Sequence, residues 1–183
     1  MREVKIPRFL HELFGEKQTL NGLIFIGVFS VLATLLTVLI GLDALKQLEV
    51  YRVILLVTLM IDIYGGIIAN FTRGTKEYYD NRPTLKKIFV IIHPHAILIF
   101  LLAGVSYLYG IYMYAFLVAS NVLVRLIKNR NYQELLAIGI NILAAVILFE
   151  IFKNVPIYVI LLTFGLTVKL IYAFSVDLVP VKS

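Results

Sequence analysis

The sequence reads TLMIDIYGGIIANFTR from Thr58 to Arg73, and this stretch indicates the fold class and a candidate site. Asp62 lies in the middle of an apolar run long enough to cross a bilayer. A charge at membrane depth costs roughly 2.5 to 3.5 kcal/mol on insertion scales, so such residues are rare and commonly functional. On a helix, Asp62 shares a face with the small residues Gly65, Gly66 and Ala69. Small residues let a neighbouring helix approach closely, so we expect Asp62 to face the inside of a bundle.

The composition is that of a polytopic membrane protein. Of the 183 residues, 61% are hydrophobic, whereas a soluble domain is nearer half apolar. The chain has no cysteine, which excludes disulfides, thiolate nucleophiles and cysteine metal ligands. The net charge of +6 is typical of a membrane protein with basic cytoplasmic loops, so we predict no nucleic-acid partner.

We predict an all-α integral membrane protein, a bundle of six transmembrane helices within residues 20–176. Each predicted helix corresponds to an apolar run of roughly 20 residues, the length needed to cross a bilayer. The basic and apolar residues of segment 1–19 predict an amphipathic helix in the membrane interface, and residues 177–183 form a cytoplasmic tail. A re-entrant hairpin made by the third and fourth runs is the alternative. The predicted spans are residues 20–42, 51–71, 88–106, 109–127, 134–152 and 156–176.

The distribution of Lys and Arg predicts the orientation. Six spans place both termini on one side of the membrane. Thirteen Lys and Arg residues fall on that side and three on the other, with Lys169 inside a span. Because cytoplasmic loops carry the excess of positive charge, we expect a multi-pass protein of the cell membrane with both termini in the cytoplasm.

Polar residues recur at a similar depth in five of the six predicted spans. At about 1.5 Å per residue, Asp62 lies roughly 13 Å and Lys169 roughly 10 Å from the inner boundary. We therefore infer a polar cavity in the cytoplasmic half of the bundle, with the 72–87 loop at its mouth. The candidate lining residues are Asp62, Tyr64, Asn70, His93, His95, Asn121, Arg125, Asn141 and Lys169.

Several of these residues have two interpretations. Asp62 and Lys169 form either a structural ion pair or a titrating site with a movable counter-charge. His93 and His95 point about 200° apart on a regular helix, so they bind one metal only if Pro94 distorts it. Arg125 either extends to the interface or holds a carboxylate or phosphate. The sequence leaves any metal or cofactor open.

Three functions remain open. The first is binding or translocation of a small solute or ion, linked to protons through Asp62, Lys169 and a histidine. The second is a membrane-embedded enzyme that acts on a lipid or lipophilic substrate by Asp and His acid-base or metal chemistry. The third is a structural or accessory subunit. The bilayer and a small solute, ion or lipid are the expected partners. The pattern assigns no catalytic residue and no oligomeric state.

Overall fold

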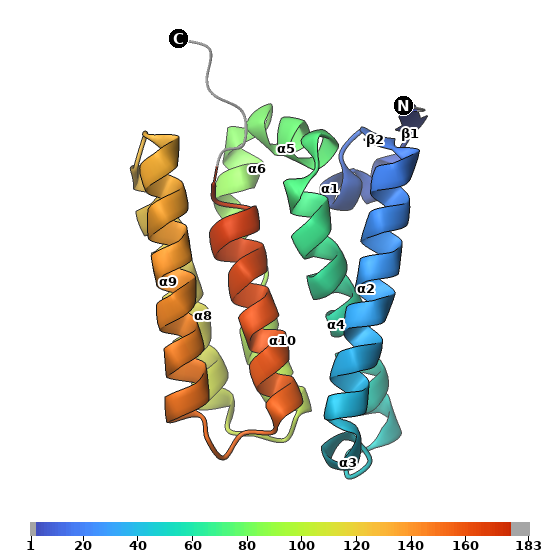
Figure 1. Cartoon of the computed structure of the whole chain (residues 1–183), viewed down its shortest axis with the longest axis vertical. Helices are drawn as coiled ribbons and strands as arrows, with labels where there is room; N and C mark the ends of the chain where they lie inside the picture. The colour runs from blue at the N-terminus through green and yellow to red at the C-terminus, as the bar shows by residue number, and fades with distance from the viewer. Residues whose placement is uncertain (1–2, 177–183) are drawn as a thin grey trace.

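Long apolar helices form the body of the protein, as the composition predicts. The computed structural model describes residues 3–176, most of which are helical (Figure 1). In this part of the chain, four helices are long and apolar enough to cross a membrane. They are α2 (Leu20–Ile40), α4 (Val50–Phe71), α8 (Tyr107–Leu126) and α9 (Arg130–Ile151). The all-α class is therefore confirmed.

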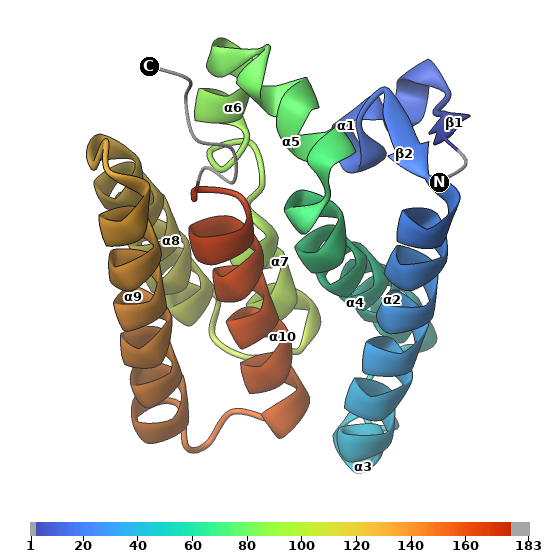
Figure 2. The same cartoon turned by 45° about the horizontal axis from the view of Figure 1, so that its top comes forward.

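A fifth apolar helix is shorter and lies within the bundle. It consists of α10 (Ile157–Thr167) and η2 (Val168–Ala173), a π-helical segment that continues it without a break. Together they contact α2, α4, α8 and α9, and two views place them among these helices (Figures 1 and 2). Because this helix is apolar and buried on most sides, it forms much of the core, and Lys169 is one of its few polar residues.

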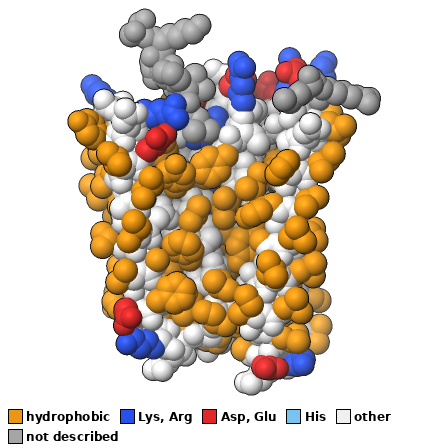
Figure 3. All heavy atoms as spheres, viewed as in Figure 1, with side chains coloured by type: hydrophobic (Ala, Val, Ile, Leu, Met, Phe, Trp, Pro, Cys, Tyr) orange, Lys and Arg blue, Asp and Glu red, His pale blue; other side chains and the backbone are white. Residues whose placement is uncertain are grey.

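The two ends of the bundle carry the charge, and the middle of the visible face is covered by hydrophobic side chains (Figure 3). One end holds α3 (Leu42–Leu45). The other holds α5 (Arg73–Asp80), α6 (Pro83–Ile88) and the start of the described chain (Figure 1). An apolar belt between two charged ends is the surface expected of a protein that spans a bilayer.

The N-terminal segment is not the amphipathic helix that the sequence predicts. It forms a short antiparallel hairpin that encloses two single helical turns. The break has a local cause, because Pro7 is extended and Gly15 has a positive φ of 75°. The elements are β1 (Glu3–Lys5), η1 (Arg8–Leu10), α1 (His11–Phe14) and β2 (Lys17–Thr19).

This hairpin packs on the start of α5. A Cβ added at Gly15 would lie 2.1 Å from the carbonyl oxygen of Gly74, and one added at Gly74 would lie 2.0 Å from that of Lys17. Backbones can approach this closely only through glycine. The first two residues of the segment, and the predicted tail 177–183, lie outside the described residues.

The predicted third span, 88–106, is not one helix. α6 ends at Ile88, and α7 (His95–Leu102) begins only after Pro94. Pro94 lacks a backbone N–H and cannot continue a helix. Side chains satisfy two carbonyls in the break, since His93 Nδ1 donates to Phe89 O at 2.5 Å and the Tyr114 hydroxyl donates to Ile91 O at 2.5 Å. Such partners make irregular backbone tolerable at membrane depth.

Candidate functional site

Three of the predicted residues meet in one cluster, which we call the Asp62 cluster: Asp62, His95 and Lys169. Asp62 comes from α4, His95 is the first residue of α7, and Lys169 lies in η2. Lys169 Nζ donates to Asp62 Oδ2 at 2.7 Å and lies 3.3 Å from Asp62 O. His95 Nε2 lies 3.4 Å from the same Oδ2 atom. The cluster therefore joins three helical segments through one carboxylate oxygen.

Gly66 provides the space through which Lys169 reaches Asp62. A Cβ added at Gly66 would lie 2.3 Å from Lys169 Cε and 2.7 Å from its Nζ. The lysine side chain is only 3% exposed. A buried ammonium is costly unless it is paired, and Asp62 supplies the charge that pairs it. The glycine that the sequence indicated as a packing position thus serves the ion pair directly.

The backbone is irregular on two sides of the cluster. Lys169 lies in the six-residue π-helix, and His95 follows the break between α6 and α7. π-helical turns are rare and frequently occur at functional sites. His93, within the break, stacks on His95 with ring centroids 5.1 Å apart and an interplanar angle of 11°. Two departures from regular helix therefore converge on one carboxylate.

Asp62 also lines a groove between α2 and α4. Its side chain is 30% exposed, compared with 16% for His95. The groove has a volume of about 330 Å³, and the contacts from Lys169 and His95 both go to Oδ2 rather than Oδ1. The lining residues are Leu13, Phe14, Ile26, Gly27, Ser30, Thr58, Ile61, Asp62, Gly65, Gly66 and Ala69.

Three other predicted residues, Tyr64, Asn121 and Asn141, lie outside the Asp62 cluster and form hydrogen bonds between helices. The Tyr64 hydroxyl pairs with Thr37 Oγ1 of α2 at 2.7 Å. Asn121 donates to Leu170 O at 3.2 Å and to the Ser175 hydroxyl. Interhelical hydrogen bonds of this kind hold membrane helices together.

Asn141 accepts from the Thr167 hydroxyl of α10 at 3.0 Å, and it donates to Ala137 O within its own helix at 2.8 Å.

Two further predicted residues, Asn70 and Arg125, lie nearer the charged end with α5 and α6. Asn70 Nδ2 is buried without a hydrogen-bond partner within residues 3–176. It lines a small pocket together with Tyr79. Burial raises the pKa of Tyr79 above its ordinary value of 10.0, so its hydroxyl stays protonated and donates to Glu12 O at 2.9 Å. Arg125 Nη1 donates to Lys86 O at 2.9 Å.

The α2 side of the groove was missed by the sequence reasoning. Ser30 is 4% exposed and donates to Ile61 O at 2.7 Å, and the Cβ position of Gly65 lies 3.2 Å from Ser30 Oγ. A signal was present, because Ser30, Thr34 and Thr37 recur at helical spacing within an apolar run. All three are buried.

The donor set around Asp62 does not form a metal site. Across residues 3–176, no three His, Asp or Glu side chains are grouped closely enough to hold an ion. Asp62 and His95 supply two candidate ligands, and the Lys169 ammonium occupies the position next to the shared oxygen. A cation placed beside that ammonium would be repelled.

The fold and the Asp62 cluster define a mainly α-helical protein in which several helices are long and apolar enough to cross a membrane and an ionic cluster lies beside an apolar groove. Comparison of the chain with models of protein families, with curated proteins and with solved structures found no match.

Proposed function

We propose that this protein binds a small amphipathic molecule from the bilayer, with the apolar part in the α2–α4 groove and the head at Asp62. The observation that carries the proposal is that both side-chain contacts of the Asp62 carboxylate go to one of its two oxygens. Asp62 Oδ2 accepts from Lys169 and lies beside His95, while the side chain remains 30% exposed in a groove lined mainly by apolar residues. A ligand with a hydroxyl or amine head could donate to Oδ1.

A ligand site of this kind fits the usual design of small-molecule pockets. Such pockets are mostly apolar and carry a few polar groups that orient the ligand. Here Ser30, Thr58 and Asp62 are the polar lining residues. The groove lies between two helices whose outer faces are apolar, so a lipophilic molecule can enter from the membrane. We propose binding of the ligand and not its passage across the membrane.

The proposal includes a topology. The chain would cross the membrane six times, with the broken segment 83–102 as the third crossing and α10 with η2 as the sixth. Lys and Arg are concentrated at the end with α5 and α6, which supports a cytoplasmic position for that end and for both termini. The Asp62 cluster would then face the inner half of the cell membrane.

A fluorescence experiment tests the binding site, because the chain has no tryptophan. Ile61 lines the groove and is 47% exposed, so Ile61→Trp places a single reporter there. The probes are bromo-undecanol, which has a hydroxyl head, and bromo-undecane, which has none. We expect saturable quenching, with tighter binding of the alcohol. Adding Asp62→Asn should weaken binding of the alcohol by about tenfold, the factor for one hydrogen bond to a charged group, and leave the alkane unchanged.

The matched control is Leu143→Trp on α9. Leu143 is 59% exposed and lies outside the groove. It should show only non-saturable quenching by either probe. If the Ile61→Trp and Leu143→Trp proteins respond alike to the alcohol, the groove is not a binding site and the proposal fails.

A second candidate is acid-base catalysis on the same class of lipophilic molecule. The specific observation in its favour is the Asp62–His95 contact of 3.4 Å beside the groove. A carboxylate and an imidazole in one site can exchange a proton with a bound substrate. Mass spectrometry of the membrane lipids after incubation with the protein would show a product that disappears with His95→Gln. If lipid masses do not change with the wild-type protein, catalysis on those lipids is excluded and binding is retained.

A further inference from the structure

The polar side chains that line the α2–α4 groove offer hydrogen-bond acceptors to a ligand. The Ser30 hydroxyl donates to Ile61 O at 2.7 Å. The Thr58 hydroxyl donates to Ile54 O at 2.9 Å. Each hydroxyl carries one hydrogen, so both oxygens are left with lone pairs only. The ionised carboxylate of Asp62 also accepts and does not donate, so it completes a set of three acceptors.

The side-chain donors of the Asp62 cluster do not line the groove. Lys169 and His95 both contact Asp62 Oδ2, and neither belongs to the groove lining. The Lys169 side chain is only 3% exposed. Within residues 3–176, no side chain donates to Asp62 Oδ1. The groove therefore receives an acceptor oxygen without the donors that surround the other oxygen of the same carboxylate.

The charge of Asp62 is already balanced within the protein. Lys169 Nζ lies 2.7 Å from Oδ2 and supplies one positive charge to the carboxylate. An ammonium head on the same carboxylate would lie close to this second ammonium and be repelled by it. A carboxylate head would be repelled by Asp62 itself. A neutral head that donates a hydrogen bond meets neither repulsion.

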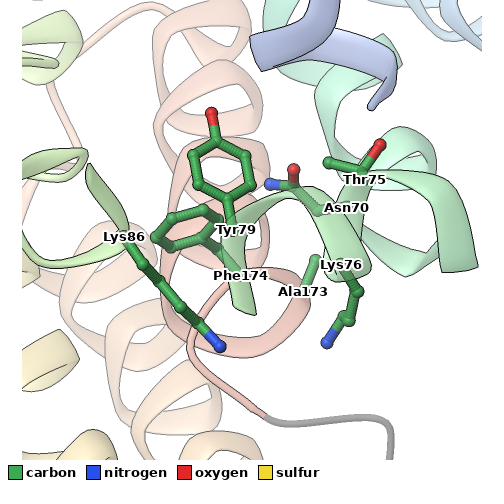
Figure 4. A pocket seen from close by; sticks show the side chains of 7 residues that line it. All are labelled: Asn70, Thr75, Lys76, Tyr79, Lys86, Ala173 and Phe174. Atoms are coloured by element: carbon green, nitrogen blue, oxygen red, sulfur yellow. The ribbon is translucent and has the colours of Figure 1, made fainter. Parts of the chain in front are cut away.

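The small pocket that Asn70 lines differs from the groove in both size and chemistry (Figure 4). Its volume is about 10 Å³, which is room for no more than one water molecule. Asn70 Nδ2 is buried there and has no hydrogen-bond partner in the part of the chain that the structure describes. This pocket holds an unpaired donor in a space too small for an organic head, whereas the groove of about 330 Å³ holds acceptors.

We propose that the molecule bound in the α2–α4 groove has a neutral alcohol head, whose hydroxyl donates to Asp62 Oδ1. The inference rests on the proposed function and narrows its ligand to one chemical class, the lipophilic alcohols. Esters, ketones and ethers only accept hydrogen bonds, so they find no side-chain donor among Ser30, Thr58 and Asp62. The groove thus selects its ligand by the direction of the hydrogen bond and by the absence of charge.

The test uses the Ile61→Trp protein and three probes that differ only at the head. They are bromo-undecanol, its methyl ether, and bromo-undecylamine, which is charged at neutral pH. We expect the dissociation constant of the ether to be about tenfold higher than that of the alcohol, the factor for one hydrogen bond to a charged group. The ammonium probe should also bind more weakly than the alcohol, because Lys169 repels it.

A second apolar groove provides the matched control for these probes. It is lined by α9, α10 and η2 and has a volume of about 370 Å³. Ile142 lines it and is 60% exposed, so Ile142→Trp places a reporter there. Because the surface of this groove is apolar, the alcohol and the ether should bind there with dissociation constants within about twofold of each other. The control also corrects for unequal partition of the probes into the micelle.

A first pair of variants tests the acceptor. In Asp62→Asn, the ratio of the ether and alcohol dissociation constants should fall from about ten to about one, because the charged acceptor is gone. If this variant does not fold, the double variant with Lys169→Met replaces it, since no charge is then left unpaired in the cluster.

A second pair of variants tests where the probes bind. Gly27 lines the groove, and a Cβ there has nothing within 4 Å, so Gly27→Leu fills part of the groove without a clash. It should weaken binding of the alcohol and the ether alike. Gly139 on α9 has the same free space at its Cβ position, and Gly139→Leu should leave both dissociation constants unchanged.

The outcomes separate the alcohol class from the binding site itself. Equal dissociation constants for the alcohol and the ether at Ile61→Trp overturn the alcohol class and leave the binding site in place. Tighter binding of the ammonium probe, or the same preference for the alcohol at Ile142→Trp, also overturns the alcohol class. If none of the probes quenches Ile61→Trp saturably, the proposed function fails as well.

Discussion

Asp62 and Asn141 are two polar side chains within long apolar helices, and both bond to the helix formed by α10 and η2. Asn141 meets Thr167 at 3.0 Å, and Asp62 meets Lys169 at 2.7 Å. Their surroundings differ. Asn141 is 9% exposed and both of its polar atoms are bonded within the bundle. Asp62 is 30% exposed, takes its two side-chain partners on one oxygen, and lines the α2–α4 groove.

This difference separates a contact that holds helices together from one that can also receive a ligand. Asn141 also lines a groove, of about 370 Å³, but each of its polar side-chain atoms has a hydrogen-bond partner within the bundle. Asp62 has a structural role through Lys169 and retains an exposed edge in the groove. The ion-pair interpretation and the binding-site interpretation of Asp62, which are alternatives at the level of sequence, are therefore compatible in the structure.

The largest expected effect comes from removing the charge that neutralises Asp62. Lys169→Met leaves a carboxylate within the bundle without its ammonium partner, which should lower the free energy of unfolding by about 3 to 5 kcal/mol. The measurement is equilibrium unfolding in mixed detergent micelles. The double variant Asp62→Asn with Lys169→Met should regain most of the loss, because no charge is then left unpaired. If Lys169→Met alone is as stable as the wild type, the ion pair between Asp62 and Lys169 is contradicted.

The second expected effect concerns Gly66, the glycine against which the Lys169 side chain packs. Gly66→Ala places a methyl group where Lys169 Cε lies 2.3 Å away, and such overpacking costs about 1 to 3 kcal/mol. Gly139 on α9 is the matched control, because a Cβ there has nothing within 4 Å. Gly139→Ala should be neutral or stabilising by up to about 1 kcal/mol. Equal unfolding free energies for the two variants would show that Lys169 does not pass over Gly66.

The smallest expected effect belongs to the Asn141 contact. Thr167→Val removes one interhelical hydrogen bond, while Asn141 keeps its bond to Ala137 O. Bonds of this kind average about 0.6 kcal/mol in a membrane protein, with a maximum near 1.7. Thr167→Val should also leave the binding of bromo-undecanol unchanged, whereas Asp62→Asn lowers it. Equal losses of binding in the two variants would remove the distinction between the two contacts.

The sequence predicted the helical class and the two partners of the ion pair for clear physical reasons. Four apolar runs are long enough to span a membrane, and each forms one continuous helix. The depth estimate placed Asp62 and Lys169 close to the same level, and the small residues around Asp62 predicted a helix contact there. These arguments need only hydrophobic length and helix periodicity, which are properties of local sequence.

Other features depend on contacts that periodicity does not contain. The N-terminal hairpin forms because Gly15 and Gly74 allow two backbones to meet. The break before α7 follows from Pro94, but its tolerance depends on Tyr114, a residue of a different helix. The groove is lined by residues of α1, α2 and α4, and no single helix encodes it. Tertiary packing decides each of these cases.

The shortness of α7 has a consequence for how the chain enters the membrane during synthesis. Its eight residues rise about 12 Å, against a hydrocarbon thickness of roughly 30 Å. α7 therefore cannot be released into lipid by itself and must enter as a hairpin with α8. Gly110 of α8 suits this, because a Cβ there would lie 2.7 Å from Ile97 Cα. Lys169 follows Asp62 by 107 residues, so the ion pair can form only after the helix of α10 and η2 has been synthesised.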